Sequence, residues 1–325
     1  MRTVVCSEIG PPELLAVVEQ PSPPCGPRSL RVAVAASGVN YVDGLFVQGL
    51  YQIKPPVPFV PGSELAGTVT EVGTDVLGWS IGDTLMANVG LGGYCDEIVI
   101  GAQQAIRVPA GVDLVTAAAI GQSYCTAWFS LTRRVTVTEG DWVLVLGAAG
   151  GVGLASIDVA KMLGAHVIAV ASTGDKRQLC LDRGADAVID PGTESVKDRA
   201  REISGGGVDI AIDPVGGDLS DHALRALGFD GELLIIGFAA GPIPKLAANQ
   251  ILLRNRRVVG VDWGAWAMAH PDDNASLADE VLAAVAAGSL HPIQPSTYRL
   301  EEAGVALRDL LDRRITGKAV LTSGS

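Results

Sequence analysis

The chain has 325 residues, of which 48% are hydrophobic and 18% are charged, so it is long enough for two domains that each bury a large core. Its net charge of −12 at pH 7 argues against nucleic acid and anionic membrane surfaces as partners, because an acidic surface repels phosphate groups. A local basic patch is the alternative that the overall charge leaves open.

The sequence carries no targeting or membrane signal that we can identify. Residues 1–10 contain one arginine and no apolar stretch long enough for a secretory signal. The most apolar stretch, residues 142–160, contains several glycines and Asp158, whereas a membrane span needs about 20 mostly apolar residues, so we expect a buried strand and helix there. The five cysteines are odd in number and form no C-x-x-C pair, which favours reduced thiols. We therefore expect a cytoplasmic protein.

The first 115 residues or so favour short strands separated by glycine and proline. Expected strands lie at Leu30–Ala35, Gly67–Val72 and Glu97–Ile100. The segment Lys54–Gly62 contains four prolines, which lack N–H donors and restrict the residues before them, so it must be an ordered loop. This part of the chain is predicted to be a β-rich, barrel-like domain.

From Leu114 onward the pattern changes to a helix at 115–131 and then, from Asp141, to alternating strands and helices. The expected strands are 142–146, 167–171, 187–189, 208–212 and 232–237, and the expected helices are 152–163, 175–183, 195–203, 219–227 and 249–253. Such alternation predicts βαβ units and a parallel sheet. A strand at 258–263, helices at 277–287 and 301–312, and a strand at 319–322 follow. The last strand is expected to return to the first domain.

The glycine-rich turn Gly147–Gly153 is the strongest motif, because it follows an apolar strand and opens a helix. Small residues let the backbone approach a pyrophosphate, and the helix N-terminus supplies free N–H groups. Relative to the pattern G-x-G-x-x-G, Ala148 stands at the first glycine position, and Gly150 and Gly153 hold the other two. A tight turn in an ordinary α/β domain is the alternative, but the βα units downstream favour a nucleotide site. The expected cofactor contacts here are Ala149, Gly150, Gly151 and Val152.

The end of the second expected strand distinguishes the two nicotinamide cofactors. NAD enzymes carry an acidic residue there for the ribose 2′-hydroxyl, whereas this chain has Ser172, followed by Lys176 and Arg177. Hydroxyls and cations suit a 2′-phosphate through charge-assisted hydrogen bonds, so we expect NADPH, bound by Ser172 and Lys176. Asp175 lies past the strand end and favours the first turn of the next helix. A solvated helix face is the alternative for Lys176 and Arg177.

Five strings follow one another along the chain: residues 37–43, 58–67, 147–153, 213–217 and 317–321. In this order they resemble the medium-chain dehydrogenase/reductase superfamily, and over the whole chain the sequence is similar to its zinc-independent NADPH:quinone oxidoreductase family, which includes zeta-crystallin. The resemblance implies an α/β protein in two parts. A β-rich, GroES-like catalytic barrel would span 1–118 and 289–325. A Rossmann domain with a doubly wound parallel sheet would span 119–288 and bind NADPH.

The resemblance raises the question of zinc, because other members of the superfamily hold a catalytic zinc with a cysteine, a His-Glu pair and a later cysteine. The matching positions are Asn40, Ser63 with Glu64, and Gln122. Amides and a hydroxyl are poor zinc ligands compared with thiolate and imidazole. The region that matches their structural zinc lobe contains one cysteine, Cys95, instead of four. We therefore expect no metal.

Reduction of a quinone or an activated C=C bond can proceed without a metal, because the cofactor supplies the hydride and the protein orients the acceptor. By resemblance, Asn40 and Tyr51 line the substrate cleft as the catalytic, substrate-orienting groups. Thr126 lies near the nicotinamide ribose, and the backbone of Gly237 and Phe238 holds the nicotinamide amide. A loop anchor against the neighbouring prolines is the alternative for Tyr51.

The sequence thus predicts an NADPH-dependent oxidoreductase that transfers hydride to a quinone or another α,β-unsaturated carbonyl. The apolar strand at 258–263 would be an exposed edge, and such edges invite pairing, so we expect a homodimer, as the resemblance also implies. Two alternatives stay open. One is an enoyl-thioester reductase, although no basic entrance for a long acyl carrier arm stands out. The other is an NADPH-binding protein with little turnover.

Overall fold

The structure, a computed structural model, describes residues 1–323, which form two compact units. The first unit contains residues 1–122, 270–288 and those from 292 onward, and the second contains 123–269 and 289–291. The boundary falls inside helix α2 (Leu114–Phe129). The expected domain boundaries differ from these units chiefly at α9 (Pro271–Ala286), which packs against β7 (Ala105–Arg107) in the first unit. The boundaries of the functional domains stay a prediction.

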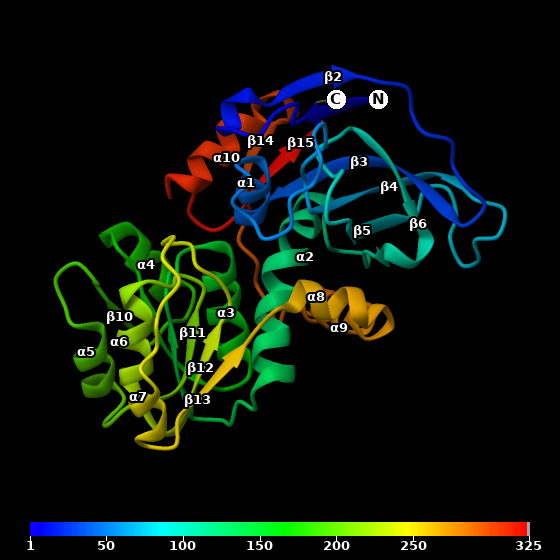
Figure 1. Ribbon diagram of the computed structural model, residues 1–325. Helices are drawn as coiled ribbons and strands as arrows, with labels where there is room; N and C mark the ends of the chain where they lie inside the picture. Colours follow the sequence, from blue (N-terminus) through cyan, green and yellow to red (C-terminus); the bar gives the residue numbers. More distant parts are fainter. Residues whose placement is uncertain (324–325) are drawn as a thin grey trace. The chain divides into compact units, whose positions relative to one another are not determined.

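The first unit is built on a mixed sheet in which the C-terminal strand lies beside an early one (Figure 1). The sheet order is β14-β15-β3-β4-β5-β7, with β6 also paired to β3. These strands span Ser29–Val39 (β3), Glu64–Val72 (β4), Thr84–Asn88 (β5), Glu97–Gly101 (β6), Ser296–Arg299 (β14) and Ala319–Thr322 (β15). The antiparallel pairing of β15 with β3 confirms the expected return of the last strand.

Smaller elements complete the first unit. A two-stranded sheet joins β1 (Arg2–Val5) to β2 (Ala16–Glu19), and α1 (Tyr41–Val47) packs against α10 (Ala303–Leu311). Helix α1 was not expected from the sequence. The first unit has one apolar core around β1, β15 and α10 and another around β3 and β4. Both are lined by buried aliphatic side chains, which include Leu307 in the first core and Leu30 in the second.

The second unit has a six-stranded, fully parallel sheet of order β10-β9-β8-β11-β12-β13. Its strands are Trp142–Val145 (β8), His166–Val170 (β9), Ala187–Ile189 (β10), Val208–Asp213 (β11), Leu227–Ile235 (β12) and Arg257–Gly260 (β13). Its helices are Gly151–Met162 (α3), Gly174–Asp182 (α4), Val196–Ile203 (α5), Asp218–Ala226 (α6), Ala248–Leu252 (α7) and Trp263–Ala269 (α8). This doubly wound order, beside the β-rich first unit, confirms the expected fold class.

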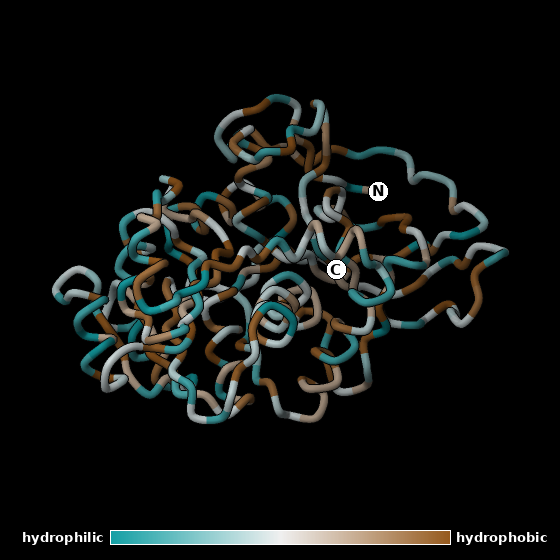
Figure 2. Tube along the Cα trace, turned by 60° about the horizontal axis from the view of Figure 1, so that its bottom comes forward, coloured by the Kyte–Doolittle hydropathy of each residue, from teal (hydrophilic) through white to brown (hydrophobic). Residues whose placement is uncertain are grey.

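Burial explains why the strands of the second unit read as continuous apolar runs. Helix α3 packs against β8 and β9, and α6 packs against β11 and β12, so the sheet is covered by helices. Figure 2 shows hydrophobic stretches inside this unit and hydrophilic ones along its outer loops. The expected strand at 258–263 is shorter than predicted, because β13 ends at Gly260 and α8 begins at Trp263.

Two general expectations can be compared with the described residues. All five cysteines are free thiols, and four of them are buried. Within residues 1–323, none of the helices combines the length and the apolar character that a membrane span requires.

Candidate functional site

The glycine-rich turn lies at the carboxyl end of β8, where open parallel sheets bind ligands. Gly147 has a φ of 57°, and the N–H of Gly150 donates to its carbonyl at 3.0 Å. A side chain at Gly153 would place its Cβ 2.5 Å from the Gly147 carbonyl oxygen and 2.6 Å from Ala148 Cα. Only glycine at position 153 therefore lets α3 begin directly against the turn, as the motif predicts.

Other predicted cofactor contacts follow the carboxyl ends of neighbouring strands. Ser172 is exposed just after β9, and Lys176 lies in the first turn of α4. Gly237 and Phe238 come after β12, and the Phe238 side chain is exposed. Because all these strands are parallel, their carboxyl ends share one edge of the sheet with the turn at Gly147. The remaining predicted cofactor contact, Thr126, is buried within α2.

The contacts of Arg177 separate it from this group. Its Nη1 donates to the carbonyl of Ala171 at 3.0 Å and lies 2.9 Å from Oδ2 of Asp190. The guanidinium thus ties the end of β9 to the loop after β10. Ser172 and Lys176 remain the groups suited to a 2′-phosphate, while Thr173 caps α4 by accepting from the N–H of Lys176.

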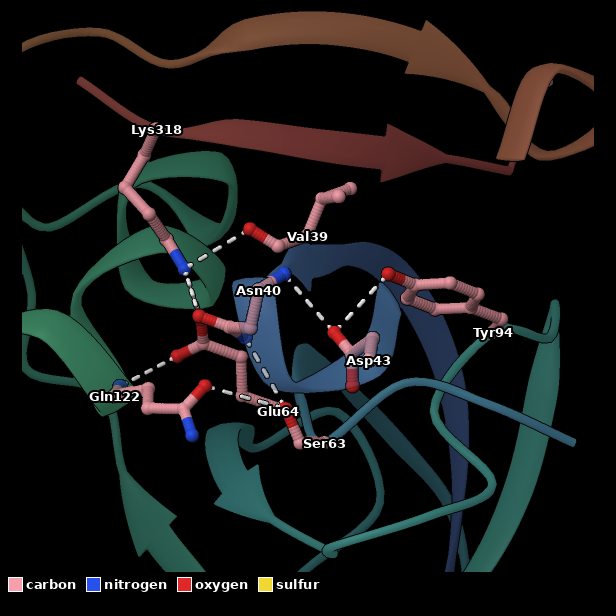
Figure 3. A network of polar contacts seen from close by, with 8 residues as sticks. All are labelled: Val39, Asn40, Asp43, Ser63, Glu64, Tyr94, Gln122 and Lys318. Atoms are coloured by element: carbon pink, nitrogen blue, oxygen red, sulfur yellow. Dashed lines mark hydrogen bonds and ion pairs between the residues drawn. The ribbon is translucent and has the colours of Figure 1, made fainter. Parts of the chain in front are cut away.

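A second candidate site is a buried polar network that lies entirely within the first unit (Figure 3). Asn40 directly precedes α1 and is 8% exposed. Its Nδ2 donates to Ser63 Oγ at 3.2 Å and to Glu64 Oε1 at 2.9 Å, and its Oδ1 accepts from Lys318 Nζ at 2.5 Å. These three partners fix the orientation of the amide.

Glu64 and Lys318 are the charged centre of this network. Lys318 Nζ lies 2.6 Å from Glu64 Oε1 and donates to the Val39 carbonyl at 3.4 Å. The other oxygen, Oε2, accepts from the backbone N–H of Gln122 at 2.7 Å. A Cβ at Gly121 would come 2.8 Å from that oxygen, so the absence of a side chain there makes room for the carboxylate. Buried charges need such partners.

Asp43 and Tyr94 extend the network beneath α1. Asp43 Oδ2 accepts from the backbone N–H of Asn40 at 2.9 Å and from Tyr94 Oη at 3.1 Å. Burial raises the pKa of Asp43 to about 7, against the opposing effects of the Asn40 N–H, Lys318 and the Tyr94 hydroxyl. Burial and the neighbouring carboxylate raise the pKa of Tyr94. Within residues 1–323, Oδ1 of Asp43 has no hydrogen-bond partner.

Gln122 is the member of the network with a donor to spare. Ser63 Oγ donates to its Oε1 at 3.3 Å, which directs the amide, and Gln122 is half-buried. In the described part of the chain its Nε2 makes no hydrogen bond, and Figure 3 shows this nitrogen pointing away from the other labelled residues. A held amide N–H of this kind can donate to a carbonyl oxygen.

Tyr51 lies outside this hydrogen-bonded network. Its half-buried ring packs edge-on against Phe46, the last-turn residue of α1, with ring centroids 4.9 Å apart. The structure thus joins Tyr51 to Asn40 through helix α1.

The residues at the positions that match zinc ligands do not fit a zinc ion. They offer two amides, a hydroxyl and one carboxylate, and the Lys318 ammonium already contacts two of their oxygens, Asn40 Oδ1 and Glu64 Oε1. Within residues 1–323, no group of three or more His, Cys, Asp or Glu side chains is arranged to hold a metal.

From the sequence, Asn40 was expected to be a substrate-orienting group, Ser63 and Gln122 were expected only to be positions that lack zinc ligands, and Glu64, Asp43 and Lys318 had no expected role. The available signal was a lysine directly before an apolar terminal strand, Lys318 before Ala319–Thr322. A lysine is seldom buried without a partner, and Glu64 at the start of β4 was the acidic residue within the matching string.

Comparisons with known proteins agree with this architecture. The alcohol dehydrogenase GroES-like domain matches residues 26–146, and the zinc-binding dehydrogenase family matches residues 151–281. Quinone oxidoreductase-like protein 2 of Rattus norvegicus is 35% identical over 99% of this chain and 92% of that protein. The chain belongs to the quinone oxidoreductase-like family of medium-chain dehydrogenases/reductases. It is thus a member of an oxidoreductase family.

Solved structures show the same fold over the full chain. The Escherichia coli quinone oxidoreductase complexed with NADPH has a TM-score of 0.93 at 27% identity, covering 99% of this chain and 100% of that one. Mycobacterial Rv1454c complexed with NADPH has a TM-score of 0.92 at 32% identity, with 99% and 100% coverage. A polyketide synthase from Mycolicibacterium smegmatis, described as mycocerosic acid synthase-like, is 33% identical over 91% of this chain and 14% of its own length.

Proposed function

We propose that this member of the family is an NADPH-dependent oxidoreductase that transfers hydride to a quinone or another α,β-unsaturated carbonyl without a metal. The observation that carries the proposal is the Lys318–Glu64–Asn40 network, which has an internal ammonium and amides at the positions where zinc-dependent members have ligands. The relatives named as quinone oxidoreductases support the acceptor class.

The second unit suits NADPH. The turn from Ala149 to Val152 offers backbone N–H groups at the start of α3, which favour a pyrophosphate. Ser172 and Lys176 can donate to a 2′-phosphate, and the residues directly after β9, Ala171 to Thr173, include no carboxylate. Gly237 and Phe238 follow β12 on the same edge, where we place the nicotinamide amide, and Thr126 is assigned to the ribose. When bound, NADPH supplies the hydride.

The first unit suits polarisation of the acceptor. Charge develops on the acceptor's carbonyl oxygen as hydride is transferred, and preorganised donors stabilise such charge. We assign this task to the polar face formed by Asn40, Ser63 and Gln122, with Tyr51 orienting the substrate. The free Nε2 of Gln122 is the additional donor that the structure brings forward, because the amide of Asn40 already has three partners.

The test is steady-state oxidation of NADPH with a panel of quinones, enals, enones and enoyl thioesters. We expect quinones or enones to give the highest kcat/KM. Absence of turnover with every acceptor, together with tight NADPH binding, would instead favour an NADPH-binding protein with little turnover.

Enoyl-thioester reduction is the second candidate, and the match to a segment of a polyketide synthase favours it. The same panel separates the two candidates. A kcat/KM for enoyl thioesters well above that for any quinone would assign the chain to thioester reduction.

We further propose a cytoplasmic homodimer. Strand β13 is the last strand of its sheet and pairs only with β12 among the described residues, and Val258 is exposed on it. Light scattering at micromolar concentration should give twice the chain mass. The substitution Val258→Lys should shift the mass toward the monomer, and Val305→Lys, at an exposed position of α10, should leave it unchanged. A monomeric wild-type protein would refute the dimer.

A further inference from the structure

The second unit carries a concentration of positive charge away from the glycine-rich turn. One open surface cavity of about 250 Å³ is lined by Asp198, Gln250 and five cations: Lys197, Arg201, Arg225, Arg254 and Arg256. Arg256 directly precedes β13, and its Nη2 donates at 2.9 Å to the carbonyl of Leu227, which begins β12. The cavity therefore lies at the amino ends of these parallel strands, opposite the edge assigned to NADPH.

The cations of this cavity outnumber the carboxylates that contact them. Lys197 is 2.8 Å from Asp198, and Arg225 is 3.3 Å from Asp221. Within residues 1–323, the other three arginines of the cavity have no carboxylate at ion-pair distance. In a chain with a net charge of −12, such a local excess of positive charge stands out and attracts anions.

Arg256 is the buried member of the cluster. It is only 6% exposed, and its donors satisfy the carbonyls of Gln250, Arg225 and Leu227, which gives it a structural role at the ends of α6 and α7. Its Nε is buried and has no hydrogen-bond partner among the described residues. Burial, and then the neighbouring guanidinium of Arg254, lower the pKa of both Arg201 and Arg256. The guanidinium groups of the cluster thus repel one another.

Arg254 has no comparable structural role. It is exposed, and its side chain makes no hydrogen bond within the described residues. It has a φ of 74°, and the next residue, Asn255, has a φ of 54°. This left-handed conformation costs about 1 kcal/mol or more for a residue other than glycine. The chain therefore keeps an arginine where glycine would be easier, beside the other cations.

We propose that this cavity is a second anion site, which binds the phosphate groups of a small phosphorylated compound carrying at least two negative charges. Guanidinium groups match phosphate oxygens in geometry and charge, and a bound dianion would offset the repulsion among the arginines. The volume suits one or two phosphate groups, because whole drug-sized ligands occupy pockets of about 300–1,000 Å³. The site does not depend on the proposed reaction.

The test is calorimetric titration of the full chain with inorganic pyrophosphate, and separately with ADP, at fixed ionic strength. Three variants are compared with the wild type: Arg254→Ala, the double variant Arg201→Ala/Arg254→Ala, and the control Arg199→Ala. Arg199 lies on α5, the helix that also carries Arg201, and it is paired with Glu202 at 2.7 Å. It does not line the cavity. Arg254→Ala and the control remove the same charge, and Arg254→Ala breaks no side-chain hydrogen bond.

We expect pyrophosphate affinity to fall at least about tenfold in Arg254→Ala, and further in the double variant, because charge-assisted hydrogen bonds are lost. It should stay within about twofold in Arg199→Ala. An equal loss of pyrophosphate and ADP affinity in Arg254→Ala would show that the site binds phosphates alone, whereas a larger loss for ADP would show that it also holds a nucleoside. Affinity that is unchanged in Arg254→Ala, or reduced equally in the control, would overturn the proposal, because pyrophosphate would then be held at the glycine-rich turn or by net charge.

Discussion

The ammonium of Lys318 lies 2.6 Å from Oε1 of Glu64, with only 11% and 2% of their side chains exposed. The pair ties the residue before the C-terminal strand to the first residue of β4, and through Asn40 it also reaches the start of α1. Neither charge can be solvated by water at this depth, so each one is stabilised chiefly by the other.

Lys318→Met should therefore destabilise the protein strongly. Removing one partner of a buried pair leaves an uncompensated charge, which costs about 3–5 kcal/mol. Urea denaturation should show this loss, and the double variant Lys318→Met/Glu64→Gln should recover part of it.

The matched control is Lys161→Met. Lys161 pairs with Asp186 at 2.8 Å, but both side chains are 32% exposed. Exposed pairs are worth about 1 kcal/mol or less. Similar losses in the two lysine variants would show that the Lys318 pair is not special.

Asp43→Asn should change how stability depends on pH. The pKa of Asp43 is raised to about 7 in the folded protein, above about 3.9 for an unfolded aspartate. Between these values the folded state binds more protons, so the contribution of Asp43 to wild-type stability falls as pH rises from about 4 to about 7. Asparagine cannot titrate. The stability of the variant relative to wild type should therefore rise across this interval, by on the order of a few kcal/mol, and then level off. A pH-independent difference in urea unfolding would contradict this.

The sequence predicted the nucleotide-binding unit well because its signals are local. The glycines of the turn at Gly147–Gly153 and the alternation of apolar runs with helices depend on neighbours in the chain, and the strand at Ala187–Ile189 has the predicted bounds. By contrast, α1 contains a glycine and two valines, which disfavour a helix. Tertiary packing against α10 overrides that preference.

The polar network was harder to predict because it joins residues far apart in the sequence. Asn40, Glu64 and Lys318 meet only because β15 pairs with β3 and β3 pairs with β4. No spacing rule relates a lysine at position 318 to a glutamate at 64. The sequence identified Asn40 by resemblance, but the ammonium that orients its amide required the fold.

Cofactor preference tests the second unit. NADPH should bind at least about tenfold more tightly than NADH, a difference of about 1.4 kcal/mol. Lys176→Ala should reduce that preference because a 2′-phosphate loses a cation, and the control Lys161→Ala should keep it. The measurement is fluorescence titration with both cofactors, and equal affinities in the wild type would refute the assignment.

Substitutions at Tyr51 and Asn40 test the first unit. Tyr51→Phe keeps the ring contact with Phe46 and removes only the hydroxyl, so turnover should fall while NADPH affinity stays nearly unchanged. Asn40→Ala should lower turnover further. The control is Tyr298→Phe, whose hydroxyl contacts Asp309 at 2.9 Å. It should leave turnover unchanged.

Kinetic constants separate the roles of these two residues. A change confined to KM would indicate uniform binding rather than stabilisation of the transition state. Full turnover in both variants on the best acceptor would contradict the polar-face assignment, and catalysis would then rest on positioning of the cofactor and on protons from solvent.

The central claim, metal-free hydride transfer from NADPH, is tested most directly by isotope transfer. Enzyme that has been dialysed against a chelator and assayed for zinc is mixed with NADPH deuterated at the transferring C4 position and with the best enone of the panel. The account predicts that deuterium appears on the β-carbon of the product, because the cofactor supplies the hydride. It also predicts that the dialysed enzyme, with zinc far below one ion per chain, reacts as fast with the same deuterated NADPH as enzyme that was not dialysed. Product without deuterium, or a rate that follows the zinc content, would contradict it.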